Sequence, residues 1–281
     1  MDIVLLIKAI IMGVVEGITE FLPISSTGYL ILTADLLNFW TKDKADLFVV
    51  VIQLGAILAV IYEYWGRLWH SLMGLVTGKA VVDMTNPKQL GLSLIVATIP
   101  VMVMGIVFAD VIKAYLFSPM VVAVMLIMGG LLIFYVEKRP QPIIAKEAEQ
   151  VSLKTAMMIG LFQCLALVPG TSRSGATIIG ALWLGVSRKA AAEFSFFLGI
   201  PVIVGAGLLD LLEHQDTLTH TQDWWVLGVG VLVSFVVALL CIRWMVAWVS
   251  RRDFTIFAWL RIMTGVVVLL STLVFGYDIQ G

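Results

Sequence analysis

Two carboxylates near the N-terminus have the spacing and the surroundings of a reactive site. Glu16 and Glu20 are four residues apart, so a helix places both on one face. They are followed by Pro23 and by three hydroxyl residues that end at Gly28. The neighbouring residues are almost all apolar, and carboxylates inside a lipid bilayer are costly and usually functional. This pattern predicts acid–base chemistry, or cation binding by the two carboxylates, at membrane depth.

A second polar stretch carries the opposite charge. Residues 168–175 read Val-Pro-Gly-Thr-Ser-Arg-Ser-Gly, again within apolar surroundings. The guanidinium of Arg173 is a planar, permanently charged fork that suits phosphate oxygens. An arginine at membrane depth needs anions nearby, and Glu16, Glu20 and a bound phosphate would supply them. We therefore expect the two stretches to meet and to form one anion site.

Several residues of the two stretches are expected to hold the phosphates. Glycines allow close approach of the backbone, hydroxyls donate hydrogen bonds, and helix N-termini at a break present free N–H groups to an anion. The predicted phosphate-binding residues are Ser25, Thr27, Gly28, Gly170, Thr171, Ser172, Ser174 and Thr177.

Simpler interpretations remain open for the same residues. The two glutamates could form a structural ion cluster with Arg173, although buried ion pairs are weak stabilisers. The serines could merely cap helix ends. Gln53 and Gln163 lie in apolar segments, where hydrogen bonding between helices is an equal alternative to a site role. The three histidines fall in connecting segments and are expected to be solvated: His70, His214 and His220.

The composition indicates a polytopic, all-α membrane protein. The chain of 281 residues is 60% hydrophobic and 13% charged, against about 25% charged in an ordinary soluble domain. Its mean hydropathy is +1.03. No basic run suggests a nucleic-acid partner. A spanning helix needs about 20 mainly apolar residues. Six segments come near that length: Leu47–Tyr64, Leu90–Ala109, Met120–Val136, Phe194–Leu212, Trp224–Ile242 and Phe254–Phe275.

Two further apolar regions are interrupted by the polar stretches. Val4–Leu32 and Leu153–Leu184 each look like two short helices that meet at a polar turn. Non-helical backbone at membrane depth occurs only inside protein or beside a wet cavity, so we interpret both regions as re-entrant helix pairs. Each half of a single domain, 1–281, is then one re-entrant pair followed by three spans. Three spans is an odd number, which predicts an inverted repeat with halves at 1–136 and 153–281, joined by a linker at 137–152.

The basic residues support this topology. With re-entrant pairs and six alternating spans, thirteen of the 18 Lys and Arg residues fall on one side, and four fall on the other. Arg173 lies at a tip. The positive-inside rule then places both termini outside the cytoplasm. Arg261 lies in the first turns of the last span, and we expect it to snorkel to the interface. The connections Trp65–Gln89 and Asp210–Asp223 are expected to be soluble.

The motifs carry a resemblance to a known family. Glu16-x3-Glu20 with Phe-Leu-Pro-Ile-Ser-Ser-Thr-Gly at 21–28, and Pro-Gly-Thr-Ser-Arg-Ser-Gly-Ala-Thr at 169–177, resemble the undecaprenyl-diphosphatases, also called bacitracin-resistance proteins. The match extends to residues 52–55 and 257–262. The resemblance implies hydrolysis of undecaprenyl diphosphate to the monophosphate, which recycles the lipid carrier for peptidoglycan synthesis. It also implies bacitracin resistance and a bacterial inner-membrane location. In that membrane, the charge distribution makes both termini periplasmic.

The predicted mechanism follows from one departure from that family. Many members have a histidine after Ser-Ser-Thr-Gly, whereas this chain has Tyr29. Ser26 is our candidate nucleophile, with Glu20 as general base in place of a histidine. Alternatively, Glu20 or Glu16 activates water, with Mg²⁺ or Ca²⁺ bound by both carboxylates.

No organic cofactor is expected, and a homodimer is a candidate assembly. A polyprenyl-phosphate transporter or flippase that uses the same midplane anion site is the alternative function.

Overall fold

The computed structural model describes residues 2–77, 87–116, 118–139 and 141–275. Within these ranges the regular structure is helical, apart from one isolated bridge between Ala145 and Val186. The α-helices are α1 (Ile3–Thr19), α2 (Ser26–Leu37), α3 (Lys42–Glu63), α4 (Trp65–Thr77), α5 (Pro87–Leu116), α6 (Pro119–Glu137), α7 (Leu153–Cys164), α8 (Arg173–Trp183), α9 (Arg188–His214), α10 (Thr221–Val249) and α11 (Thr255–Phe275). Three short 3₁₀ turns accompany them: η1 (Ala148–Gln150), η2 (Leu165–Leu167) and η3 (Gln215–Thr217).

Six of these helices are long and apolar enough to cross a membrane, and they are α3, α5, α6, α9, α10 and α11. They coincide with the six segments that the sequence predicts, which confirms the all-helical, multi-pass class. The helices exceed the predicted spans at several ends because polar end residues continue the helix. For example, α9 begins at Arg188, six residues before the predicted start, with Ser187 as its N-cap.

Two of the predicted connections are partly helical in the structure. The connection expected at Trp65–Gln89 contains α4, whose apolar residues recur at helical spacing. Part of that connection, residues 78–86, lies outside the described residues. The loop expected at Asp210–Asp223 is shorter, because α9 continues to His214 and α10 starts at Thr221. Residues 208–222 contain neither Pro nor Gly, so little in them breaks a helix.

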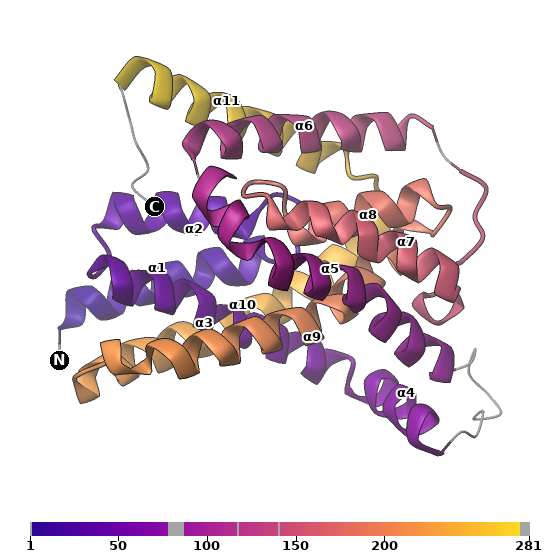
Figure 1. Cartoon of the computed structure of the whole chain (residues 1–281), viewed down its shortest axis with the longest axis horizontal. Helices are drawn as coiled ribbons and strands as arrows, with labels where there is room; N and C mark the ends of the chain where they lie inside the picture. The colour runs from indigo at the N-terminus through magenta and orange to yellow at the C-terminus, as the bar shows by residue number, and fades with distance from the viewer. Residues whose placement is uncertain (1, 78–86, 117, 140, 276–281) are drawn as a thin grey trace.

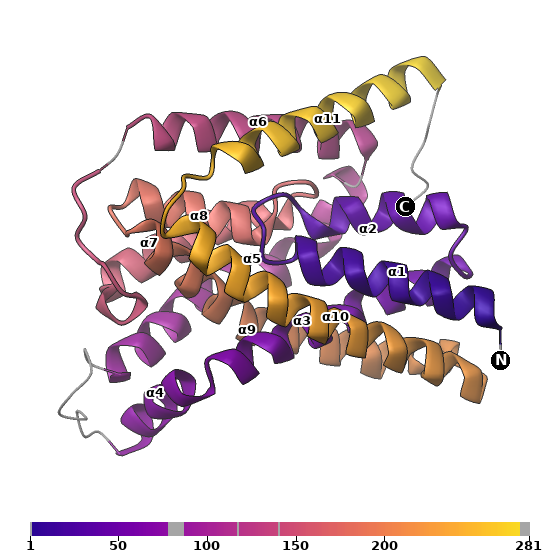
Figure 2. The same cartoon turned by 180° about the vertical axis from the view of Figure 1, so that it is seen from behind.

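The two interrupted regions form short helical hairpins that enter from opposite ends of the molecule. In Figures 1 and 2, the α1–α2 hairpin enters from the end where α1 begins, and the α7–α8 hairpin enters from the other end. A helix of 12 residues, such as α2 or α7, is only about 18 Å long, whereas the hydrocarbon core is about 30 Å thick. The turns that end these short helices therefore lie inside the bundle.

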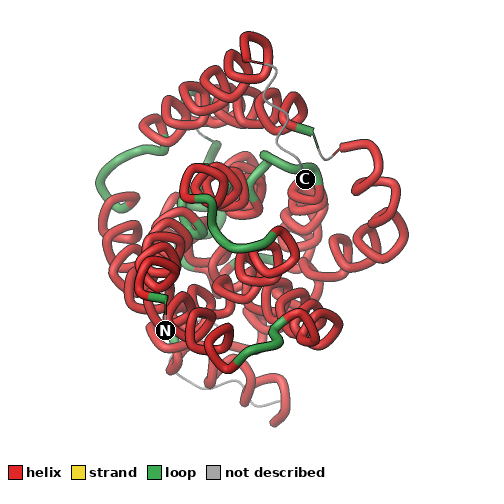
Figure 3. The backbone as a smooth tube through the Cα atoms, turned by 90° about the vertical axis from the view of Figure 1, so that its left-hand side faces the viewer, coloured by secondary structure: helices red, strands yellow, loops and turns green. Residues whose placement is uncertain are grey.

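Glycines let the first helix of each hairpin pack closely on a long span. A Cβ atom on Gly13 or Gly17 would lie 2.8 Å from the backbone of α10. A Cβ on Gly160, in α7, would lie 2.3 Å from the Ala97 carbonyl of α5. Small residues allow such close contact between helices in membranes. Seen end-on, the α6–α11 pair forms the upper edge, and the other helices cluster beneath it (Figure 3).

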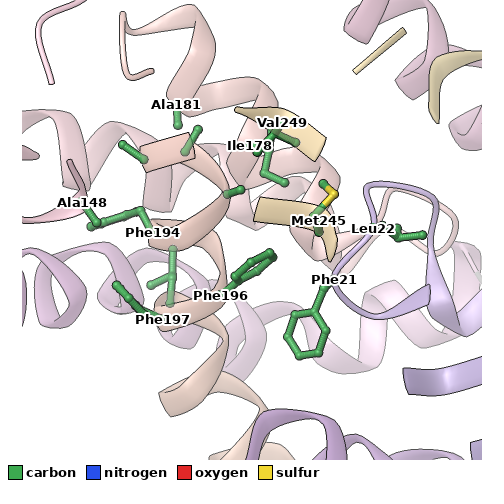
Figure 4. Close-up of a cluster of buried hydrophobic side chains, with 14 of the residues drawn as sticks. Phe21, Leu22, Ala148, Ile178, Ala181, Phe194, Phe196, Phe197, Met245 and Val249 are labelled. Atoms are coloured by element: carbon green, nitrogen blue, oxygen red, sulfur yellow. The ribbon is translucent and has the colours of Figure 1, made fainter. Parts of the chain in front are cut away.

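A buried aromatic core fixes the first hairpin turn. Phe21 directly follows Glu20 and packs edge-on against Phe196 of α9, with ring centroids 5.1 Å apart. Both rings are fully buried, and Figure 4 shows Phe21 beside Phe196. Because such pairs have defined geometry, this contact fixes the position of the neighbouring Glu20.

Candidate active site

The two hairpin turns meet at one cavity. Its volume is about 290 Å³. The polar side of the wall contains both turns, and the rest is mainly apolar. Nine of the predicted site residues line it: Glu20, Ser25, Ser26, Thr27, Gly28, Gly170, Ser172, Arg173 and Ser174. Glu16, Thr171 and Thr177 do not line it. The apolar wall includes Ile31, Leu32, Val101, Val122, Val202, Ile203 and Val268.

One chain of hydrogen bonds joins the two turns within this cavity. Ser26 Oγ donates to Glu20 Oε2 at 2.5 Å. Arg173 Nη2 donates to the other carboxylate oxygen, Glu20 Oε1, at 2.8 Å. All three groups are largely buried. A carboxylate that holds a serine hydroxyl is placed to take its proton, and the guanidinium orients that carboxylate.

The second helix of each hairpin begins at a residue with an unusual backbone. Ser25 precedes α2 with φ 78°, and Ser172 precedes α8 with φ 69°. Residues other than glycine rarely adopt positive φ, and such strain concentrates at functional sites. Each helix N-terminus leaves backbone N–H groups without partners in the helix, and these N–H groups favour an anion. Both N-termini lie at the cavity wall, so the cavity is suited to a phosphate.

Arg173 is held by α9 as well as by Glu20. Its Nη1 donates to the Ser195 carbonyl at 2.7 Å. The guanidinium lies directly on Gly199, where a Cβ atom would approach Nη1 to 2.6 Å. Any side chain at residue 199 would therefore displace the guanidinium from its contact with Glu20.

Arg261 does not snorkel to the interface, and that prediction was wrong. Its side chain is fully buried. Its guanidinium lies within hydrogen-bond reach of five backbone carbonyls, at 2.9–3.3 Å: Pro23, Leu126, Met125, Gly170 and Thr171. Because Pro23 is in the first turn and residues 170–171 are in the second, this one side chain ties the two turns together.

Sequence reasoning missed this role for a physical reason. An arginine near the end of a span normally reaches water. The position of Arg261 in the sequence does not by itself indicate that it is buried. The available signal was in another helix. A Cβ on Gly129 of α6 would lie 2.1 Å from Arg261 Nη2, so the absence of a side chain at Gly129 leaves the space that the guanidinium fills.

The hydroxyls of the second turn mostly bind protein atoms. Ser172 Oγ caps α8 by accepting from the Gly175 N–H at 3.1 Å. Ser174 Oγ donates to the Leu22 carbonyl at 2.9 Å. Thr177 is fully buried and donates to Ser195 Oγ at 2.7 Å. In contrast, Ser25 makes no side-chain cap for α2. The first turn thus keeps more of its donors available for a ligand.

Five side chains with buried polar atoms lack a hydrogen-bond partner among the described residues: Glu16, Gln163, Thr171, Ser234 and Trp248. Both carboxylate oxygens of Glu16 and both amide atoms of Gln163 are without a hydrogen bond there. Glu16 lies one helical turn before Glu20, whose N–H donates to the Glu16 carbonyl at 3.0 Å. Gln163 lines the cavity from α7, and Gln53 lines it from α3. Hydrogen bonding between helices therefore does not account for the position of Gln163.

The three histidines lie away from the cavity. His70, His214 and His220 are exposed, as expected, and none of them lines it. Tyr29 does line the cavity, and its hydroxyl is 2.7 Å from Thr264 Oγ1 of α11. Tyr29 thus connects α2 to α11 at the cavity wall, and its hydroxyl bonds Thr264 rather than Glu20.

Known proteins resemble this chain over all or nearly all of its length. A protein from Psychrobacter sp. (strain PRwf-1) described as undecaprenyl-diphosphatase is 77% identical, with all of both chains covered. Undecaprenyl-diphosphatase 1 of Acinetobacter baylyi is 59% identical over 96% of this chain and 97% of that protein. The undecaprenyl-diphosphatase of Nitrosospira multiformis is 49% identical over 96% of each chain. Residues 9–267 match the family described as bacitracin resistance protein BacA. The chain belongs to the BacA family.

Proposed function

We propose that this protein hydrolyses undecaprenyl diphosphate to undecaprenyl phosphate and inorganic phosphate in a bacterial inner membrane. The observation that carries the proposal is the Ser26–Glu20–Arg173 chain at the polar side of a largely apolar cavity. The cavity matches a substrate with an anionic head and a hydrocarbon tail. The relatives described above bear the name of this activity. Recycling of the lipid carrier and bacitracin resistance follow from the same reaction.

Ser26 is the proposed nucleophile. Glu20 takes the hydroxyl proton while Ser26 Oγ attacks the terminal phosphorus. The bond between that phosphorus and the bridging oxygen breaks, which releases undecaprenyl phosphate and leaves a phosphoserine. Glu20 then passes its proton to solvent and deprotonates a water molecule, which attacks the phosphoserine and releases inorganic phosphate. Arg173 and the free N–H groups of α2 stabilise the charge on the transferred phosphoryl group.

A direct attack by water is the competing mechanism. Neither carboxylate oxygen of Glu16, one turn from Glu20, has a hydrogen-bond partner in the described part of the chain. Oxygen ligands of this kind suit Mg²⁺ or Ca²⁺. Among the described residues, no group of three or more His, Cys, Asp and Glu side chains converges, so substrate oxygens would complete the ligand set. A bound cation would neutralise charge on the diphosphate. In this mechanism Glu20 or Glu16 deprotonates the attacking water.

An inverted repeat accounts for the arrangement of the two hairpins. Gly13 and Gly160 each lie twelve residues before the strained serine of their turn, and each packs on the backbone of a long span. The two hairpins enter from opposite ends (Figure 1). These features support one re-entrant pair and three spans per half, within the predicted boundaries 1–136 and 153–281.

The charge distribution supports an orientation for this arrangement. Basic residues concentrate at the end of the molecule where α7 and α9 begin. Four of them pair with acids there: Arg67 with Glu149 and Glu193, Arg188 with Glu137, Lys189 with Glu147 and Glu193, and Arg243 with Glu63. The positive-inside rule makes that end cytoplasmic. Both termini are then periplasmic. A homodimer stays a prediction.

A phosphate-release assay tests the function. Detergent-purified protein is mixed with undecaprenyl diphosphate, and inorganic phosphate is measured. We expect steady release by the native protein and at most residual release by Arg173→Ala. Equal, background-level release by both proteins would contradict hydrolysis. Movement of fluorescent polyprenyl phosphate across reconstituted vesicles, without any phosphate release, would instead support the transporter.

A further inference from the structure

Gln163 is a buried polar side chain whose contacts do not explain it. It is fully buried on α7, and neither amide atom has a hydrogen-bond partner among the described residues. A buried polar group without a partner destabilises a fold. Gln163 also lies in the wall of the cavity that contains Ser26 and Arg173. An unsatisfied amide in the wall of a binding cavity indicates that a ligand supplies the missing partner.

The position of Gln163 mirrors that of Glu16. Gln163 lies nine residues before Ser172, and Glu16 lies nine residues before Ser25. These two serines precede the second helices of the hairpins, and both have positive φ. Both buried side chains lack partners among the described residues. By the same spacing, Leu167 stands where the first hairpin has Glu20. The first hairpin thus carries two carboxylates, and the second carries an amide and a leucine.

This difference matters for binding a diphosphate, because a carboxylate repels the anion and an amide donates hydrogen bonds to it. A carboxylate at residue 163 would add negative charge to the wall that already contains the Arg173 site, and would repel an anion. The amide has the same shape and no charge, and it offers two N–H donors to phosphate oxygens. A diphosphate has more oxygen acceptors than one guanidinium can satisfy, particularly because Arg173 also donates to Glu20 and Ser195.

We propose that Gln163 is a binding residue for the substrate's diphosphate, and that its amide N–H groups donate to phosphate oxygens from the α7 wall of the cavity. The proposal rests on the proposed function for the identity of the anion. It assigns the two hairpins different roles at equivalent positions: the residue at position 16 works with the catalytic carboxylate, and the residue at position 163 holds the anion.

The first test separates binding from chemistry. Gln163→Leu and Gln163→Met keep the volume and remove the donors. We expect each to raise KM for undecaprenyl diphosphate about tenfold, the equivalent of one lost hydrogen bond to a charged group, while kcat changes less than about threefold. Gln163→Glu should raise KM further at neutral pH, and the increase should shrink as pH falls and the new carboxyl is protonated. Unchanged KM in the Leu and Met variants would overturn the proposal.

A matched control excludes a purely structural role. Ser234 of α10 is also fully buried with an unpaired hydroxyl among the described residues, but it does not line the cavity. Ser234→Ala should leave KM unchanged. If Gln163 were a buried polar residue without a role in binding, Gln163→Leu would resemble Ser234→Ala. It would then have a higher thermal stability and a native KM.

A binding measurement makes the outcome independent of catalysis. A non-hydrolysable polyprenyl methylenediphosphonate should raise the thermal midpoint of the native protein, because a ligand that binds only the folded state stabilises it. The stabilisation should be smaller for Gln163→Leu at the same ligand concentration and unchanged for Ser234→Ala. Equal stabilisation of all three would overturn the proposal even if hydrolysis itself were not observed, whereas absent hydrolysis with this pattern would contradict only the proposed function.

Discussion

The turn between α1 and α2 and the turn between α7 and α8 each contain a serine with positive φ, but they differ in how many of their hydroxyls bond other protein atoms. In the first turn, Ser25 makes no side-chain cap for α2, and Ser26 donates to Glu20. In the second turn, Ser172 caps α8, and Ser174 bonds the Leu22 carbonyl of the first turn. Arg261 then takes up the carbonyls of residues 170 and 171.

This difference separates reactive groups from the support that positions them. A donor that is already bonded to protein is held rigidly and is less available to a ligand, whereas a free donor can rearrange toward substrate. The first turn therefore supplies the nucleophile and base. The second turn supplies a fixed platform from which Arg173 reaches across the cavity. A substitution in one turn should therefore have an effect that the equivalent substitution in the other turn does not.

The largest loss is expected at the link between the turns. Arg173→Ala should lower kcat/KM about 10²–10³-fold, because it removes the charge that stabilises the phosphoryl group and orients Glu20. Arg173→Lys should recover little, since an ammonium cannot bond Glu20 and the Ser195 carbonyl with the same fork. Phosphate release measured across substrate concentrations checks this. Recovery to near-native rates by the lysine variant would show that charge alone suffices.

The next largest effect is expected at Arg261, which bonds backbone carbonyls of both turns. Arg261→Met should leave five carbonyls without their shared donor. We expect a loss of at least about 3 kcal/mol, seen as a lower thermal midpoint in detergent, together with a strong loss of activity. The thermal midpoint of Arg261→Lys should lie between those of the native protein and the Met variant, because lysine keeps the charge but has fewer donors. A native midpoint in the Met variant would mean that the turns are held by other contacts.

Two glycines provide a paired test of stability against activity. A Cβ on Gly28 would meet nothing closer than 3.9 Å, so Gly28→Ala should keep or slightly raise stability within α2. Gly28→Ala should still raise KM about five- to tenfold, because the new methyl group occupies space at the N-terminus of α2 that the phosphate needs. Gly170 has φ +87°, and a Cβ there would lie 2.6 Å from the Val122 carbonyl. Gly170→Ala should therefore destabilise the protein. Lower stability with native KM in Gly28→Ala, and raised KM with native stability in Gly170→Ala, would contradict the roles given to the two turns.

The smallest effect is expected at a structural hydroxyl. Ser174→Ala removes the bond to the Leu22 carbonyl, which should lower stability by about 0.5–1.5 kcal/mol. KM should change less than about twofold, since this hydroxyl is already used within the protein. Thermal unfolding and steady-state kinetics on the same preparation measure both quantities. A large rise in KM with native stability would return Ser174 to the phosphate-binding group.

Much of the architecture could be predicted because it rests on local signals. Long apolar segments predicted all six spans, and Pro and Gly within polar stretches predicted the two turns. The meeting of Glu20 and Arg173 could be predicted because each charge needs a partner at membrane depth. Helix ends were less predictable, and α4 was missed, because hydropathy alone does not distinguish an apolar helix outside the spans from a loop.

The remainder depends on contacts between distant segments. The role of Arg261 requires its partners at residues 23, 125, 126, 170 and 171, and the space opened by Gly129. No spacing within one helix reveals such a set. Likewise, the hydroxyls of Ser174 and Thr177 looked equivalent to those of the first turn in the sequence, and only the fold shows that they bond Leu22 and Ser195.

Trapping a covalent intermediate tests the division of roles most directly. The purified protein would be mixed with undecaprenyl diphosphate labelled in the terminal phosphate, quenched in acid within milliseconds, and digested for peptide mapping. We predict label on Ser26, none in Ser26→Ala, and loss of most hydrolysis in that variant. Full hydrolysis by Ser26→Ala without any labelled serine would contradict the account and assign the attack to a water molecule activated by the glutamates.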